Sequence, residues 1–213
     1  MCDYFGVLLS AHSSPTFDII SQLRNMIFLL FFGFIIITTS MASPVSQPLP
    51  TAIIDSGAIV GTTTSLPSST AIVRQYLGVP FGAPPVRFSP PEPVASWSTV
   101  YNATQWGPAC IQQIGQSGKE LFGMLDLPPP ANGEGEDCLN LNIFTPGSAS
   151  AGSKAVLVWF YGGSYMNGAT SVNVYDGTSF AANQDVVVVT INYRTNFFGF
   201  PGGDVPATER NLG

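Results

Sequence analysis

The sequence predicts an α/β protein, in which a small N-terminal antiparallel sheet is followed by the first strands of a mostly parallel central sheet. Three observations support this class. Ala155–Phe160 and Val186–Ile191 are continuous apolar runs, as in strands that are buried on both faces of a parallel sheet. Between them, Asp176–Asn183 fits a short helix with Asp176 at its N-cap, which completes a strand–helix–strand unit. Shorter β-type runs separated by turn residues precede this unit.

The first residues have the pattern of a targeting signal. Met26–Ile37 is an apolar run. The small residues Ser40 and Ala42 follow it, in the pattern of a signal-peptide cleavage site. The run is shorter than the roughly 20 residues that span a bilayer. We therefore expect a signal peptide over residues 26–42, no stable membrane span and a secreted, extracellular product. Residues 1–25 are interpreted as an upstream extension, with Met26 as an alternative start, which leaves residues 43–213 for the fold.

The composition excludes one class of partner. The chain has 213 residues, of which 45% are hydrophobic, enough for a core. Charged residues make up only 9%, and the formal net charge is −6. A nucleic-acid partner requires a basic surface, and this sequence has only 7 lysine and arginine residues to form one.

The β-type runs come in a definite order. Ala52–Asp55, Ala58–Thr63 and Ala71–Leu77 are separated by turn residues, so we expect them to form the small antiparallel sheet. The proline-rich segment Gly78–Pro93 is expected to be irregular and stiff. Leu139–Phe144 alternates between polar and apolar residues and is predicted to be a strand.

The cysteines agree with export. Cys2 lies upstream of the predicted signal, which leaves Cys110 and Cys138 as a pair in an oxidising compartment. Bridging them is worth about 3–4 kcal/mol in the chain-entropy model; two free buried thiols are the alternative. Asn102 begins the sequence Asn-Ala-Thr, an acceptor for N-glycosylation if it lies on the surface.

Two glycines follow the first long apolar run. Gly162 and Gly163 stand where the carboxyl end of a parallel strand forms the ligand crevice of an α/β protein. Bare backbone N–H groups at this place either cradle a phosphate or stabilise an oxyanion in acyl transfer. The glycine patterns for phosphate do not occur here, so the oxyanion role fits better. A tight turn without chemistry remains the alternative.

A series of motifs in order along the chain resembles one family. These are Gly78-Val-Pro-Phe-Gly-Ala-Pro-Pro85, Arg87-Phe88, Trp97, Glu136-Asp-Cys-Leu-Asn-Leu-Asn142, Trp159-Phe-Tyr-Gly-Gly163 and Asn192-Tyr-Arg194. The series is similar to the N-terminal part of type-B carboxylesterases, from about residue 52 to Gly213. The resemblance implies an α/β-hydrolase fold, of which this chain would contain a truncated form. The family includes esterases, lipases and cholinesterases.

The resemblance assigns roles in the glycine loop. The oxyanion hole would comprise Gly162, Gly163 and Ser164, with Gly163 and Ser164 donating backbone N–H groups and Gly162 shaping the turn. Ser164 stands where the family usually has glycine. A serine can donate its backbone N–H equally well if its own φ and ψ angles allow the turn. Asn140 replaces a common aromatic residue or threonine, a change that we expect to affect packing only.

The resemblance also implies structural pairs. Cys110–Cys138 would be the family's first disulfide, and Arg87 would form an ion pair with Glu136. The disulfide loop has no tryptophan, whereas cholinesterases carry a choline-binding one there. Five apolar residues of this loop either form a flap over the active site or pack onto the body: Leu121, Phe122, Met124, Leu125 and Leu127.

The catalytic triad of the family has no counterpart in the sequence. No G-x-S-x-G occurs, and the only histidine is His12, upstream of the predicted signal. We therefore expect no catalytic residue, metal site or cofactor in this chain, which would be the N-terminal portion of a type-B domain. By resemblance, the apolar run Ala155–Phe160 then lacks one neighbouring strand, and Arg194 lacks its acidic partner.

Two functions remain open at this point. The first is a secreted carboxylic-ester hydrolase, whose full-length form would act on a small-molecule or lipid ester through a serine acyl-enzyme. The second is a non-catalytic adhesion or binding protein of the same fold. The glycine pair favours the hydrolase, because a binding protein has no need of oxyanion donors.

Overall fold

The computed structural model describes residues 48–124, 130, 132–204, 206 and 210–213. The predicted extension, signal peptide and His12 lie outside these residues, as do Leu125 and Leu127. None of the helices within the described ranges has the length and apolarity needed to cross a membrane.

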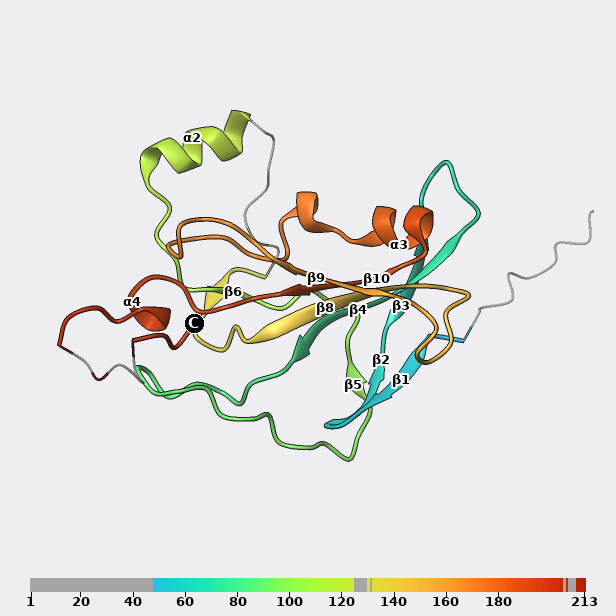
Figure 1. Ribbon diagram of the computed structural model, residues 1–213, viewed down its shortest axis with the longest axis horizontal. Coiled ribbons are helices and arrows are strands. Elements are labelled where there is room, and N and C mark those ends of the chain that lie inside the picture. Colours follow the sequence, from blue (N-terminus) through green and yellow to red (C-terminus); the bar gives the residue numbers. More distant parts are fainter. Residues whose placement is uncertain (1–47, 125–129, 131, 205, 207–209) are drawn as a thin grey trace, which may run out of the picture. The chain divides into compact units, whose positions relative to one another are not determined.

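A five-stranded sheet forms the centre of the described region (Figure 1). In spatial order, its strands are β3 (Thr62–Ser65), β4 (Ile72–Pro80), β8 (Asn140–Pro146), β10 (Val187–Ile191) and β9 (Val156–Phe160). β9 and β10 are parallel, as predicted, with Val156 opposite Val187. The other neighbours in this sheet are antiparallel.

The prediction of a mostly parallel sheet is therefore wrong for the part of the sheet that the structure describes. The chain turns back after β8, so that β9 runs in the opposite direction. β10 then lies between them, parallel to β9 and antiparallel to β8. Periodicity identifies the strands but carries no information on which strands become neighbours.

The small sheet is also different from the prediction. It contains β1 (Thr51–Ile54), β2 (Gly57–Val60) and β5 (Tyr101–Asn102); β1 and β2 are antiparallel, whereas β2 and β5 are parallel. The chain passes from this sheet into the central one at Gly61. A Cβ on Gly61 would lie 2.0 Å from the carbonyl oxygen of Gln75, so the crossing requires glycine. The predicted strand 58–63 is thus divided between the two sheets, and the predicted strand 71–77 lies in the central one.

The remaining elements are short. They are β6 (Ala109–Cys110), α2 (Gln116–Met124), β7 (Glu134–Gly135), the 3₁₀ helix η1 (Asn173–Tyr175), α3 (Thr178–Gln184) and α4 (Asn196–Gly199). The N-cap of α3 is Gly177, not Asp176 as predicted. A Cβ on Gly177 would lie 2.7 Å from the Phe144 ring, so the chain needs glycine at this residue. Asp176, one residue before the N-cap, still accepts the backbone N–H of Thr178 with its side chain.

The two faces of the central sheet are covered differently. On one face, Val73, Phe144 and Val188 pack with Ala181 of α3. On the other face, Tyr76 and Val79 of β4 pack against Ile59 of β2 and Ala103. Side chains that alternate along each strand thus fill two cores, and α3 and the small sheet lie on opposite sides of the central sheet (Figure 1).

The disulfide loop carries α2, which Figure 1 shows apart from the strands. Met124 is the one apolar side chain of the predicted flap that the structure describes, and it is 78% exposed. The interpretation that this side chain packs onto the body of the protein is wrong for Met124.

Candidate functional site: the glycine loop after β9

The loop after β9 reverses direction through an unusual backbone. Gly163 has φ 142°, and Ser164 and Tyr165 follow with φ of 53° and 61°. The carbonyl oxygen of Gly163 accepts the N–H groups of Met166 at 2.9 Å and Asn167 at 3.3 Å. A left-handed conformation costs a residue with a side chain roughly 1–2 kcal/mol. The loop therefore holds two strained residues directly after its glycine pair.

Glycine is required at residue 163 and not at residue 162. A Cβ on Gly163 would lie 1.9 Å from the carbonyl oxygen of Asn167. A Cβ on Gly162 would meet no described atom within 4 Å. The prediction that Gly162 shapes the turn is therefore wrong, because the close approach and the positive φ both belong to Gly163.

Two consecutive backbone N–H groups of the loop have no acceptor among the described residues. Among the described residues, the backbone nitrogens of Gly163 and Ser164 donate to no oxygen. Successive N–H groups in such a turn form a concave anion-binding nest. The open space beside Gly162 gives an incoming group access to them. This arrangement can stabilise a developing negative charge on oxygen.

Aromatic side chains form the wall beside the loop. An open cleft of about 590 Å³ is lined by Phe160, Tyr161, Gly162, Gly163, Ser164, Tyr165, Tyr193, Phe200, Asn211 and Gly213. The rings of Tyr161 and Tyr193 stack with their centroids 4.5 Å apart. Tyr165 packs on Phe200 with the centroids 4.8 Å apart. The cleft thus combines an apolar wall with the N–H groups of the loop.

The two stacked tyrosines also join the two parallel strands. The hydroxyl of Tyr161 donates to the carbonyl of Tyr193 at 3.1 Å, and the hydroxyl of Tyr193 donates to the carbonyl of Tyr161 at 2.9 Å. Burial raises the pKa of both phenols. Both groups are therefore neutral hydrogen-bond donors near neutral pH.

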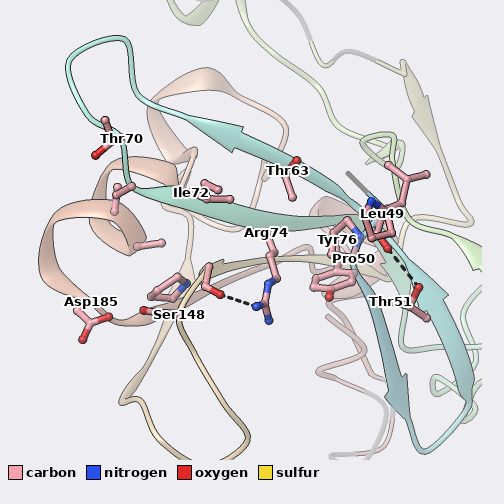
Figure 2. Close-up of a pocket in the computed structure, with 16 residues that line it drawn as sticks. Leu49, Pro50, Thr51, Thr63, Thr70, Ile72, Arg74, Tyr76, Ser148 and Asp185 are labelled. Carbon is pink, nitrogen blue, oxygen red and sulfur yellow. Dashed lines mark hydrogen bonds between the residues drawn. The ribbon is translucent and has the colours of Figure 1, made fainter. Parts of the chain in front are cut away.

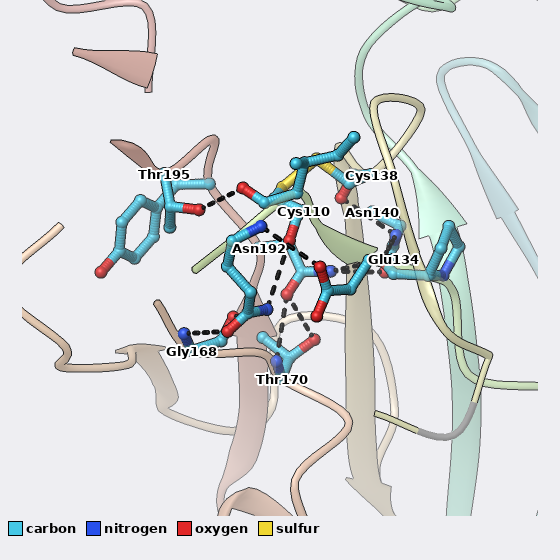
Figure 3. Close-up of a disulfide and its surroundings, with 12 residues drawn as sticks. Cys110, Glu134, Cys138, Asn140, Gly168, Thr170, Asn192 and Thr195 are labelled. Atoms are coloured by element: carbon cyan, nitrogen blue, oxygen red, sulfur yellow. Dashed lines mark hydrogen bonds between the residues drawn. A yellow bond between two sulfur atoms is a disulfide. The ribbon is translucent and has the colours of Figure 1, made fainter. Parts of the chain in front are cut away.

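The predicted disulfide is present and adjoins a buried polar network (Figure 3). Asn192 donates to the carbonyl of Pro108 at 3.1 Å and to the side chain of Asn140 at 3.2 Å, and it accepts the N–H of Thr170 at 3.0 Å. Asn140 also donates to the carbonyl of Cys138 at 3.0 Å. The prediction that Asn140 affects packing only is wrong, because its amide connects Cys138 of the disulfide with Asn192, the residue directly after β10.

Arg87 and Glu136 meet at the surface, away from the glycine loop. The Nε of Arg87 lies 3.1 Å from each carboxylate oxygen of Glu136. The guanidinium also lies over the ring of Phe198, 5.4 Å from its centroid. The hydrogen bond from Arg87 lowers the pKa of Glu136. An exposed pair of this kind contributes little to stability.

Arg194 is a buried cation with few partners. It is 4% exposed, and its Nη1 donates to the carbonyl of Ser89 at 2.7 Å. Its Nε and Nη2 have no acceptor among the described residues. Burial lowers its pKa, and the nearby Glu136 opposes this shift. Neither of the ion pairs found within the described ranges includes Arg194.

A larger cavity is lined by residues of β1, β3, β4 and α3 and of the turn after β8 (Figure 2). Its volume is about 700 Å³, and Arg74 and Asp185 are its charged residues. Both are engaged within the protein: Arg74 donates to the carbonyl of Gly147, and Asp185 pairs with Lys154. The charged groups of this cavity are thus already engaged within the protein, whereas the N–H groups of Gly163 and Ser164 have no acceptor among the described residues, so the glycine loop remains the better candidate.

The other predicted features fall elsewhere. Asn102 is exposed on β5, at a distance from the loop in sequence and in a different sheet. No group of three potential metal ligands is found among the described residues.

Comparison with known proteins assigns the family. The carboxylesterase family profile matches residues 48–213. The chain belongs to the carboxylesterase family. Its relatives include the acetylcholinesterase of Electrophorus electricus, 36% identical over 82% of this chain and 27% of that protein. The acetylcholinesterase of Bungarus fasciatus is 43% identical over 70% of this chain and 25% of that protein.

Carboxylesterase 1D of Mus musculus is 39% identical over 76% of this chain and 29% of that protein. The chain thus spans between a quarter and a third of the length of these relatives. Membership of the family implies the α/β-hydrolase fold, and the described mixed sheets with few helices agree with part of that fold.

Two features of this candidate site were not predicted from the sequence. Gln112 contacts the end of the glycine loop, and Thr170 contacts Asn192. Both contacts join residues far apart in the chain, and neither residue stands in a local pattern. Gln112 lies two residues after Cys110, and this closeness to a bridged cysteine is the only local signal for it.

Proposed function

We propose that the full-length protein carrying this chain is a secreted carboxylic-ester hydrolase of the esterase or lipase type. Its substrate would be a small-molecule or lipid ester, and its mechanism would pass through a serine acyl-enzyme. The observation that carries the proposal is the pair of N–H groups at Gly163 and Ser164, which have no acceptor in the part of the chain that the structure describes. Family membership supports the same reaction class.

These two groups have a defined role in ester hydrolysis. When a nucleophile attacks the ester carbonyl, the oxygen becomes an oxyanion in the tetrahedral intermediate. The N–H groups of Gly163 and Ser164 donate to this oxyanion, and the strained turn holds them in place before the reaction. Losing one such donor typically lowers kcat about 10²–10³-fold. The nucleophile, acid and histidine would come from outside the 213 residues.

We further propose that residues 43–213 form the N-terminal portion of the catalytic domain, after removal of a signal peptide at 26–42. The Cys110–Cys138 disulfide supports export, because such bonds persist in oxidising compartments. The exposed position of Asn102 supports its glycosylation.

The test is ester turnover by the full-length protein, secreted from eukaryotic cells. Short-chain and long-chain p-nitrophenyl esters would serve as substrates, and a phosphonate would label the nucleophile. We expect turnover and labelling of a single serine outside these 213 residues, and neither with the 213-residue chain alone. A correctly folded full-length protein without turnover would instead support the adhesion or binding function.

A further inference from the structure

The side chain of Gln112 contacts both polar groups of one peptide residue in the glycine loop. Its Oε1 accepts the N–H of Gly168 at 2.8 Å, and its Nε2 donates to the carbonyl of Gly168 at 3.1 Å. Nε2 also donates to the carbonyl of Cys110 at 3.2 Å. The amide thus joins the disulfide loop to the loop that follows β9.

Gly168 is held on its other side by an aromatic ring. It has φ 129°, and a Cβ there would lie 2.2 Å from Cδ2 of Tyr161. Tyr161 is the residue directly before the glycine pair. The backbone of Gly168 is therefore confined between the Tyr161 ring and the Gln112 amide, at the point where the loop closes.

Gln112 is itself anchored. Its backbone N–H donates to Oε2 of Glu134 at 3.3 Å, and the neighbouring Ile111 carbonyl accepts from Thr195 at 2.9 Å and from Asn196 at 2.8 Å. The disulfide fixes Cys110, two residues away. Because its backbone is held at these points, the Gln112 side chain can keep the loop residue that it bonds in a fixed position.

We propose that Gln112 is a positioning residue for the glycine loop. By bonding both polar groups of Gly168, it fixes the turn from Gly163 onward and thus the direction of the N–H groups of Gly163 and Ser164. The importance of this direction for ester hydrolysis rests on the proposed function. The contact itself does not, and can be tested without a substrate.

Amide hydrogen exchange of the full chain, followed by NMR, tests the proposal. Three amides report on the loop: Gly168, and Met166 and Asn167, which donate to the Gly163 carbonyl. Gln112→Met has a similar length and no amide, so we expect all three to exchange about tenfold faster, as loss of a local hydrogen bond predicts. Gln113→Met changes the adjacent, exposed glutamine and is the matched control.

Gln112→Glu provides a rescue in one protein. Below the ordinary glutamate pKa, at about pH 4, the protonated carboxyl group has one donor and one acceptor, which can replace both contacts with Gly168 but not the second N–H donor of the amide, which bonds Cys110. We then expect protection of the three amides close to that of the unchanged chain. At about pH 7 a carboxylate would face the carbonyls of Gly168 and Cys110 with Glu134 nearby, so protection should fall again.

All chains would carry Val158→Lys, which places a charge on the exposed edge of β9, so that association does not contribute to protection. Faster exchange of Gly168 alone would show a local contact and overturn the positioning role. Equal protection in Gln112→Met and Gln113→Met would also overturn it. Failure of the full-length protein to hydrolyse esters would leave these exchange results unchanged, so the two proposals fail separately.

Discussion

The loop has no room for a side chain at residue 163, whereas it has room for one at residue 162. A methyl group on Gly163 meets the carbonyl of Asn167 and requires a positive φ that only glycine adopts readily. We expect Gly163→Ala to lower the free energy of unfolding by about 2–4 kcal/mol. Gly162→Ala, which points into open space, should cost less than about 1 kcal/mol. Urea denaturation of both variants measures the difference, and equal losses would contradict the loop geometry.

Tyr161 gives a prediction at high pH. Burial raises the pKa of its phenol in the folded protein above the ordinary value of about 10. The unfolded chain then releases this proton first, so stability is complete below about pH 10 and falls as the pH rises further. Absorbance of phenolate should show Tyr161 ionising only as the protein unfolds. The difference spectrum against Tyr161→Phe isolates this residue; its ionisation in the folded state would refute the prediction.

At the scale of elements, the disulfide determines how firmly the segment with α2 is attached. Reduction should free this segment and lower stability by about 3–4 kcal/mol in the chain-entropy model. We expect Cys110→Ala with Cys138→Ala to lower Tm, and non-reducing peptide mapping to recover the bridged peptides from the unchanged chain. Alkylation of both thiols in secreted protein would show that the bridge is absent.

The elements also show what a sequence can predict. The apolar runs that became β9 and β10, and their parallel pairing, follow from local pattern and from the helix between them. The site of the glycine loop follows too, because it directly continues β9. The partition of β1 to β4 between two sheets does not, since it depends on the close approach of Gly61 to Gln75. The contact of Gln112 with Gly168 is likewise invisible, because it joins residues 56 positions apart.

At the scale of the whole molecule, the central sheet ends in an unprotected strand. β9 pairs only with β10 in the described sheet, and its five apolar side chains are between 40% and 60% exposed. Natural edge strands usually carry a charge that prevents pairing with other chains. The nearest one, Lys154, is engaged with Asp185 before the strand begins. An exposed apolar edge of this kind favours association between chains.

We therefore expect residues 43–213, expressed alone, to self-associate or to remain partly unfolded. Val158→Lys puts a charge in the middle of β9 and should raise the monomer fraction, measured by light scattering coupled to size exclusion. Val86→Lys makes the same charge change at an exposed residue of the segment that follows β4, outside the strands of the central sheet, and should have little effect. Association through β9 thus predicts a difference between the two lysine variants that net charge alone does not. A soluble monomer with a sharp, reversible thermal transition in the unchanged chain would contradict the prediction, because it would show that the β9 edge is stable in water without a partner.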